Sequence, residues 1–284
     1  MTTSTVTDPT RSALPAGPFA TFRAGLSDGM TIFLRNLLKL KHQPEQIVAT
    51  FAFPLMSVIL FGYVFGSAIP IPGGGNYREY LMPGLFVMSS VMGVMGSLMV
   101  IAKDNSLGVM DRFRSMPMAR SAVPFGQTAA DLVIAAGSLT IMAVCGLFFG
   151  WRAHNGIAAT LAGFGLVLLL QYAVSWVGVF LGSLAKNEET AARIGPLIMP
   201  LTMISNVFVP TDGMPTVLRA IADWNPVSAA TAACRELFGN PGLPVSSDAA
   251  WPLHHPVLTT VGWCAFLLAV FVPLSIRRFR NAGL

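Results

Sequence analysis

The chain alternates long apolar stretches with short polar connections. A transmembrane helix needs about 20 apolar residues, because each residue advances it by about 1.5 Å through about 30 Å of hydrocarbon. Five stretches reach that length, and a shorter one contains Pro196 and Pro200. The pattern predicts an all-α integral membrane protein with six transmembrane helices, at about 47–68, 81–102, 128–149, 157–185, 194–210 and 257–276.

Two segments precede the membrane domain, which we place at residues 47–284. Residues 1–18 are rich in Thr, Ser, Pro, Ala and Gly and lack the apolar core of a signal peptide, so we predict a disordered cytoplasmic tail. Residues 19–46 predict a basic amphipathic helix, whose apolar positions recur every three or four residues. Such a helix suits the headgroup plane of a membrane, and packing on a partner protein is the alternative. The apolar positions are Phe22, Leu26, Met30, Phe33, Leu37 and Leu40.

The longest connection, residues 211–256, predicts two short helices on the outer side. The first covers residues 215–224 and the second covers residues 226–238. Asn225 is placed to cap the second helix, which has a proline at its first position, and Gly239 is placed to end it. Each helix is about 15–20 Å long and too short to span a bilayer. We therefore expect short re-entrant helices between the fifth and sixth spans.

Composition and charge agree with a membrane protein. Charged residues make up 11% of the chain, against about 25% in soluble domains, which argues against a soluble enzyme or a disordered chain. Of the 18 Lys and Arg residues, 14 fall on one predicted side of the membrane. Basic residues mark the cytoplasmic side, so both termini are predicted to be cytoplasmic. The net charge of +5 is thus a topology signal, and we expect no nucleic-acid partner. The four basic residues on the outer side are Arg78, Arg152, Arg219 and Arg235.

Chemically active groups are scarce inside the predicted spans. Asp131 is the one ionisable residue there, near the cytoplasmic end of the third span. It is interpreted as a helix-start or interfacial residue, with a role in a cytoplasmic vestibule as the alternative. Ion-coupled carriers usually need acids or histidines at mid-membrane depth, and membrane enzymes need a convergent catalytic set. The predicted spans contain neither, which argues against both of these classes. Gln171 and Asn206 either join helices or line a substrate path.

Cysteine and histidine do not indicate a metal site. Cys145, Cys234 and Cys264 are far apart and are interpreted as apolar packing residues. His254 and His255 are adjacent, and neighbouring positions on a helix do not converge on one ion. We expect no metal and no cofactor bound by this chain.

One cytoplasmic connection combines charges with apolar residues. Residues 103–122 read KDNSLGVMDRFRSMPMARSA and include Met110 and Phe113 among acids and bases. This mixture favours docking on a protein, and a solvated loop is the alternative.

Three segments carry a family resemblance. They are Arg35–Ile47 before the first span, Gly108–Val123 in the cytoplasmic connection, and Ser205–Phe238, which includes WNPVSA at Trp224–Ala229. Together they resemble the permease subunits of ABC type-2 exporters, in the daunorubicin-resistance branch. The resemblance covers most of the chain from about residue 19.

The resemblance implies a bacterial plasma-membrane exporter of hydrophobic or amphipathic compounds. Two permeases, identical or related, would pair among membrane lipids, and separate subunits would hydrolyse ATP with Mg²⁺. This chain contains no G-x-x-x-x-G-K-[ST] phosphate loop, so it is expected to be a permease and not an enzyme. The alternatives are export of a lipid or glycan of the cell envelope and, less favoured, an ATP-independent carrier.

The resemblance also implies roles for particular residues. Glu45 and the run Arg112, Phe113 and Arg114 would contact the ATPase subunit. Arg219 and Trp224 would shape an outer gate. The substrate, the identity of the ATPase and the choice between homodimer and heterodimer stay open.

Overall fold

The computed structural model describes residues 28–38, 52, 55–60, 77–109, 121–208, 211, 214–241 and 250–281. All regular secondary structure in these residues is helical. The predicted all-α fold class is therefore confirmed for this part of the chain. The predicted tail at 1–18 and most of the predicted first span lie outside the described residues.

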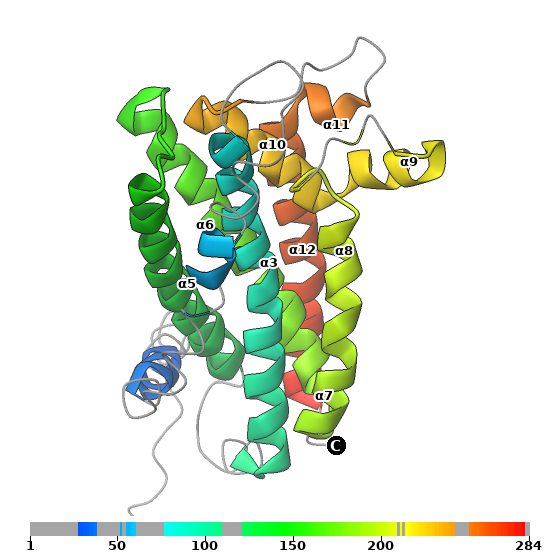
Figure 1. Ribbon diagram of the computed structural model, residues 1–284. Coiled ribbons are helices and arrows are strands. Elements are labelled where there is room, and N and C mark those ends of the chain that lie inside the picture. Colours follow the sequence, from blue (N-terminus) through cyan, green and yellow to red (C-terminus); the bar gives the residue numbers. More distant parts are fainter. Residues whose placement is uncertain are drawn as a thin grey trace, which may run out of the picture.

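Four long helices lie side by side in Figure 1 and are long and apolar enough to cross a membrane. They correspond to the second, third, fourth and sixth predicted spans, and each begins or ends within six residues of the prediction. The helices are α3 (Tyr77–Ser106), α5 (Ala122–Phe148), α6 (Gly156–Leu184) and α12 (Pro256–Asn281).

The predicted fifth span, at 194–210, has different bounds. A rod of α7 (Glu188–Ile194), η2 (Gly195–Ile198) and α8 (Met199–Met203) stands at the right of the bundle in Figure 1, and its first part packs against α3. Asn187 starts it by accepting a 2.9 Å hydrogen bond from the Thr190 amide. Two prolines near the starts of η2 and α8 lack the N–H groups of an α-helical ladder, which accounts for the 3₁₀ turn. The rod overlaps the first part of the predicted fifth span and begins six residues before it, while a fifth span itself stays a prediction.

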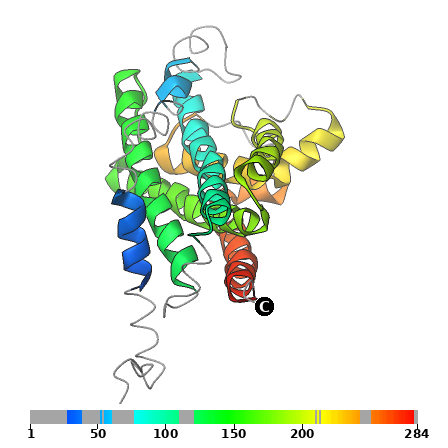
Figure 2. The ribbon, with the colours of Figure 1, turned by 90° about the horizontal axis from the view of Figure 1, so that it is seen from below.

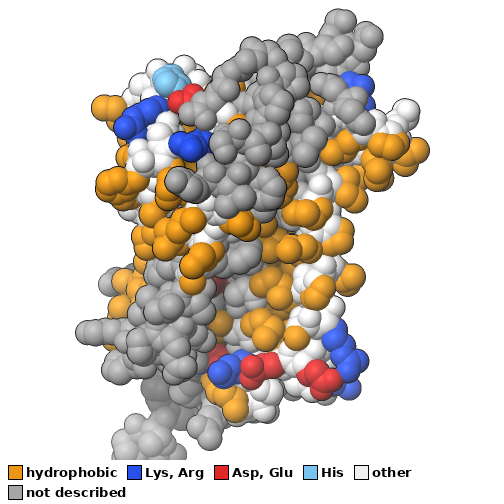
Figure 3. All heavy atoms as spheres, viewed as in Figure 1, with side chains coloured by type: hydrophobic (Ala, Val, Ile, Leu, Met, Phe, Trp, Pro, Cys, Tyr) orange, Lys and Arg blue, Asp and Glu red, His pale blue; other side chains and the backbone are white. Residues whose placement is uncertain are grey.

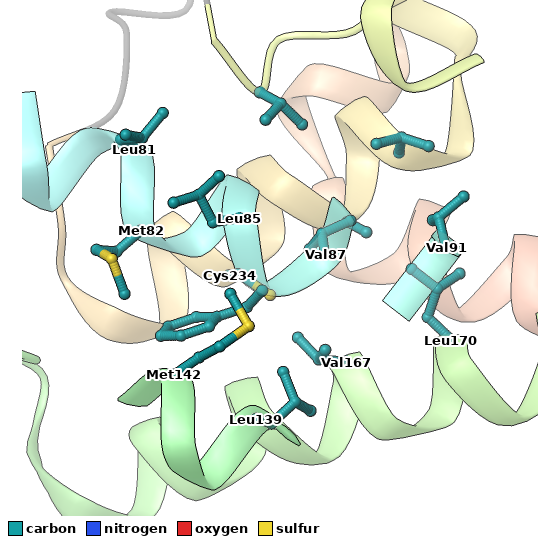
Figure 4. Close-up of a cluster of buried hydrophobic side chains, with 14 of the residues drawn as sticks. Leu81, Met82, Leu85, Val87, Val91, Leu139, Met142, Val167, Leu170 and Cys234 are labelled. Carbon is teal, nitrogen blue, oxygen red and sulfur yellow. The ribbon is translucent and has the colours of Figure 1, made fainter. Parts of the chain in front are cut away.

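The core lies between α3 and α6. The most apolar windows of these helices are 61% and 56% buried, whereas those of α5 and α12 are 22% and 11% buried. Figure 4 shows side chains of α3 meeting Leu139 and Met142 of α5, residues of α6, and Cys234. A Cβ on Gly178 of α6 would lie 2.5 Å from the Val94 carbonyl of α3, so only glycine allows this approach. Most residues of the outer helices α5 and α12 are therefore at least partly exposed.

Charged groups mark the two ends of the bundle. We call the end that carries the last turn of α3 and the first turn of α7 the basic end. Figure 3 shows charged side chains mostly at the two ends, with hydrophobic side chains between them. The opposite, capped end carries α9 (Thr216–Trp224), α10 (Pro226–Phe238) and α11 (Trp251–His254) in Figure 1. Described basic residues of the basic end are Arg35, Lys103, Lys186, Arg193, Arg277 and Arg278.

Residues 28–38 form a helix within the predicted amphipathic segment. Figure 2 shows this helix beside α5 at the basic end. Ile32, which lies off the predicted apolar face, is 2% exposed and packs near Val123 of α5, whereas Met30 of that face is 55% exposed. The helix therefore packs on its own chain through a side that the periodicity did not identify.

Candidate functional site

The two short helices of the outer segment, α9 and α10, begin and end within one residue of their predicted bounds. Pro226 begins α10, and the Asn225 side chain accepts a 2.8 Å hydrogen bond from the Val227 amide. Gly239 ends α10 with φ of 66°, a left-handed conformation that favours glycine. How deeply these helices enter the membrane stays a prediction.

Asn225 also binds the end of α8. Its Nδ2 donates hydrogen bonds of 2.7 Å to the carbonyl oxygens of Leu201 and Ile204. These two carbonyls lie at the C-terminus of a helix, where no further turn supplies donors. One amide side chain thus caps the start of α10 and satisfies the end of α8. The sequence predicted the first role only, although an asparagine, unlike a serine, offers two donors besides its acceptor.

Arg235 is the centre of the capped end, and sequence reasoning gave it no role beyond an outer-side charge. It is 3% exposed. Its Nε donates to the Tyr80 carbonyl at 2.9 Å, and its Nη2 donates to the carbonyls of Asn206 and Val207 at 3.0 and 3.2 Å. The guanidinium also lies 3.7 Å from the centre of the Tyr80 ring, a favourable cation–π position.

The Arg235 guanidinium remains a cation in this position. Burial lowers its pKa, but arginine titrates so far above neutral pH that it keeps its proton. A buried cation is costly unless hydrogen bonds replace its hydration. Here main-chain carbonyls and an aromatic ring supply that replacement. A signal was present in the sequence, since the neighbours of Arg235 on α10 are mostly small residues suited to burial.

Asn206 makes its hydrogen bonds to the neighbouring helices through its main-chain carbonyl and amide. Its carbonyl accepts from the Tyr80 hydroxyl at 3.2 Å as well as from Arg235, and its amide donates to Ser228 Oγ at 3.1 Å. Its side-chain Oδ1 is buried and has no donor among the described residues. We call Tyr80, Asn206, Val207, Ser228 and Arg235 the outer hub. It joins α3, α10 and the turn after α8.

The predicted gate residues Arg219 and Trp224 lie on α9, beside the outer hub. Arg219 Nε is 3.8 Å from Asp223 Oδ2, and Asp223 accepts a 3.0 Å hydrogen bond from Thr211. Trp224 is 58% exposed, and Val217 and Ile221 on the same face of α9 are 72% and 52% exposed. In Figure 1, α9 projects sideways from the bundle. The structure therefore places an exposed apolar ridge at the capped end, while the gating role stays a prediction.

Gln171 lies elsewhere, between α6 and α3. It is 3% exposed, and its Nε2 donates to Ser175 Oγ at 3.2 Å. A Cβ on Gly93 of α3 would lie 2.2 Å from this nitrogen, so the amide fills the space that the glycine leaves. In the described part of the chain Gln171 shares no hydrogen bond with Asn206. Its contacts are those of helix packing, and a role in a substrate path stays a prediction.

Asp131 is not a helix-start residue. α5 begins at Ala122, six residues before the predicted span, which puts Asp131 in its third turn. The carboxylate accepts hydrogen bonds from Ser97 Oγ at 2.5 Å and from Gln127 Nε2 at 2.8 Å. Apolar periodicity did not locate the helix start, because Pro124 and Gly126 in the first turns of α5 are typical of a loop.

The remaining predicted residues can be placed only in part. Glu45, Arg112, Phe113 and Arg114 lie outside the described residues, so their contact with an ATPase stays a prediction. Within the described ranges, no three His, Cys, Asp or Glu side chains gather as metal ligands. The three cysteines are free thiols, and two of them are buried.

Comparisons with known proteins agree along most of the chain. The sequence profile of the ABC-2 type transporter family matches residues 29–238. A daunorubicin resistance ABC transporter permease protein, DrrB1 of Streptomyces coeruleorubidus, is 30% identical over 98% of this chain and 95% of its own length. A doxorubicin resistance permease, DrrB of Mycobacterium tuberculosis, is 27% identical over 82% of this chain and 83% of its length. A putative transport permease, ycf38 of Cyanophora paradoxa, is 25% identical over 72% of each chain.

Proposed function

This chain belongs to the ABC-2 type transporter family, as a permease homologous to drug-resistance permeases, and we propose that it exports hydrophobic or amphipathic compounds. The observation that carries the proposal is the similarity to a daunorubicin-resistance permease along almost the whole of both chains. The fold agrees, because four helices can cross a membrane. The exported compound would be a drug, an antibiotic or a lipid.

ATP hydrolysis is assigned to a separate nucleotide-binding subunit. The 284 residues contain no phosphate loop, and we therefore assign the energy supply to a partner that binds ATP and Mg²⁺. Glu45 and the run Arg112, Phe113 and Arg114 are the proposed contacts with this partner. In the sequence, Glu45 follows the helix at residues 28–38, and Arg112 follows the end of α3. Both of these helices reach the basic end, which is where an ATPase in the cytoplasm would dock.

The proposed topology has six spans and two cytoplasmic termini in a bacterial plasma membrane. Clustering of described Lys and Arg residues at the basic end supports this orientation, because positive charge marks the cytoplasmic side. The rod from α7 to α8 and the segment before α3 would supply the two spans beyond the four long helices. The capped end, with the outer hub and α9, would then face the outside.

A second permease copy, identical or related, is the proposed membrane partner, on the strength of the family resemblance. Membrane lipids would cover the remaining apolar surface, which includes Leu258 and Phe266 of α12 at 64% and 55% exposure. Such exposure is expected of a helix in hydrocarbon and unfavourable in water.

Transport is then a shift between inward-facing and outward-facing populations. ATP closes the dimer of nucleotide-binding subunits, which pushes the segments that contain Glu45 and Arg112. The push tilts the spans where two permeases meet. The substrate leaves at the capped end, past Arg219 and Trp224 of α9.

The test uses inside-out membrane vesicles that contain the chain and its ATPase subunit, with daunorubicin as the probe. We expect ATP-dependent, vanadate-sensitive uptake of daunorubicin and its stimulation of ATP hydrolysis. Vesicles with the ATPase subunit alone are the control. Alanine at Arg112, Phe113 and Arg114 together should abolish coupled uptake.

Two results would contradict parts of this proposal. Uptake that needs no ATP would indicate a secondary carrier. ATP-dependent movement of an envelope lipid or glycan without daunorubicin uptake would indicate the lipid or glycan exporter.

A further inference from the structure

The helix at residues 28–38 is joined to α3 by an ion pair. Arg35 Nη2 lies 2.8 and 3.1 Å from the two carboxylate oxygens of Asp104, near the end of α3. The Asp104 side chain is 8% exposed and the Arg35 side chain is 25% exposed. A pair that is largely withdrawn from water is screened less by salt than a surface pair.

A chain of hydrogen bonds joins the same helix to α5 and then to α3. Asn36 Nδ2 donates to Gln127 Oε1 at 2.8 Å. Gln127 Nε2 donates in turn to Asp131 Oδ1 at 2.8 Å, one turn further along α5. Asp131 Oδ2 accepts from Ser97 Oγ of α3 at 2.5 Å. Three helices are thus connected by four consecutive side chains.

The backbones approach closely at the same place. A Cβ on Gly126 of α5 would lie 2.7 Å from the Gly29 carbonyl and 2.7 Å from Ile32 Cβ. Ile32 shares a buried cluster with Ile101 of α3 and Val123 of α5. The polar chain therefore runs through a packed contact and not across a solvent gap.

We propose that these six residues, which we call the basic-end joint, make helix 28–38, α3 and α5 move as one unit when ATP drives transport. They are Arg35, Asn36, Ser97, Asp104, Gln127 and Asp131. The inference rests on the proposed function, since it names the positioning residues that carry a push from the ATPase into the spans. Neither the predicted coupling residues nor the predicted substrate path included Arg35, Asn36, Ser97, Asp104 or Gln127.

The physical reason is that a broken contact in this joint has no ready replacement. Hydrocarbon supplies no donors or acceptors, so separation of Gln127 from Asn36 or Asp131 would leave buried polar atoms unsatisfied. Asp131 lies about 14 Å along α5 from its start, which carries the connection well into the bundle. The bonds therefore hold the three helices together during a displacement.

α3 extends this connection to the other end of the molecule. Asp104 and Ser97 belong to the joint, and Tyr80 of the same helix belongs to the outer hub. About 36 Å of continuous helix separates Tyr80 from Asp104, at 1.5 Å per residue. A displacement of helix 28–38 would thus reach the capped end through one helix.

The first experiment measures daunorubicin taken up per ATP hydrolysed in inside-out vesicles. Gln127→Leu and Asn36→Leu should each lower this ratio about tenfold, within the range of ordinary coupling free energies. Basal ATP hydrolysis and co-purification of the ATPase subunit should stay within about twofold of wild type. Thr140→Val on α5 is the matched control, because its hydroxyl bonds only the Ala136 carbonyl of its own helix in the described part of the chain. An unchanged ratio in both leucine variants would overturn the proposal.

A second variant guards against simple loss of packing. Exchange of the two amides, as Asn36→Gln with Gln127→Asn, keeps the summed side-chain length and the hydrogen-bonding groups. It should restore at least half of the wild-type ratio. Failure of this exchange while both single leucine variants fold and assemble would assign the defect to local packing and not to the hydrogen-bond chain.

The second experiment needs no transport. Gly29→Cys and Ala122→Cys, which lie outside the joint and face each other across the same two helices, are introduced in a chain whose three native cysteines are replaced, and a short thiol cross-linker is applied with and without ATP and vanadate. The yield should be equal in both states, because the two helices do not separate. A fall below half in either state would overturn the joint. Wild-type vesicles in which neither daunorubicin nor an envelope lipid moves with ATP would instead overturn the proposed function, and the cross-linking result would still stand.

Discussion

The outer hub and the basic-end joint are polar clusters that both include residues of α3, yet they hold different partners. Arg235 in the hub binds three main-chain carbonyls, from Tyr80, Asn206 and Val207. The joint connects side chain to side chain, as in Gln127 with Asp131. Main-chain carbonyls at a helix end or turn define the path of the backbone, so the hub sets the fold. Side-chain contacts between complete helices set only how those helices move together.

This difference predicts separate consequences. Loss of the Arg235 side chain strands several acceptors at once, each of which costs about 1–3 kcal/mol when buried. Loss of one amide in the joint strands one or two groups. Interhelical hydrogen bonds in membranes contribute about 0.6 kcal/mol on average. Hub variants should therefore change stability, and joint variants should change coupling.

The largest effect is expected from Arg235→Met. It should lower the free energy of unfolding by about 3 kcal/mol, because three carbonyls lose the hydrogen bond from Arg235, although the Asn206 carbonyl keeps the Tyr80 hydroxyl as a donor. Arg235→Lys should lose roughly half as much, since an ammonium keeps the charge but cannot reproduce the planar fork. Thermal unfolding in detergent, followed by tryptophan fluorescence, measures both. Equal melting temperatures for Arg235→Met and wild type would remove the hub from the account.

The connection between the two clusters is sensitive to packing between α3 and α6. Gly178→Val should cost about 3 kcal/mol, because its Cβ would lie 2.5 Å from the Val94 carbonyl. Gly165→Val on the same helix is the control, since a Cβ there has no atom within 4 Å. The control should melt within about 3 °C of wild type, equivalent to about 1 kcal/mol. Similar losses in both variants would mean that valine propensity, and not close packing, is responsible.

Asn225 tests how the end of α8 depends on the start of α10. Asn225→Ala should cost about 2 kcal/mol, because the helix cap and two donors are lost. Asn225→Ser retains a capping oxygen and should cost about half as much. The same melting experiment distinguishes the two. If serine and alanine are equally destabilising, the bonds to Leu201 and Ile204 matter more than the cap.

The smallest effect on stability is expected from Arg219→Ala. Its ion pair with Asp223 is long and Arg219 is 34% exposed, so the change should stay below about 0.5 kcal/mol. A lower rate of daunorubicin export at unchanged melting temperature would then support a role in the gate. A large fall in melting temperature would show instead that α9 is part of the rigid cap.

Local signals in the sequence predicted much of the fold. Hydropathy located α3, α5, α6 and α12, and Asn225 with Gly239 bounded α10. The helical rod begins at Glu188, six residues before the predicted fifth span, because its charged first turn gives no apolar signal, and it ends at Met203. Apolar periodicity predicts a single regular helix well, but it does not indicate where prolines change the type of helix within an apolar run.

Long-range polar contacts could not be predicted. Arg235 and Tyr80 are 155 residues apart, and Asn36 and Gln127 are 91 residues apart. No local pattern records such a pair, and Arg235 was counted only as an outer-side charge. Asn206 was identified by its polarity, but its contacts come mainly from its main chain, which no side-chain pattern can show.

The most direct test measures coupling and stability together in one vesicle preparation. Gln127→Leu should lower daunorubicin transported per ATP hydrolysed about tenfold, while its melting temperature falls by no more than about half as much as that of Arg235→Met. Arg235→Lys should have a lower melting temperature than wild type. Each folded complex should still transport as much daunorubicin per ATP hydrolysed as wild type, within about twofold. The reverse outcome, in which Gln127→Leu unfolds early and Arg235→Lys is stable but uncoupled, would contradict the assignment of the two ends.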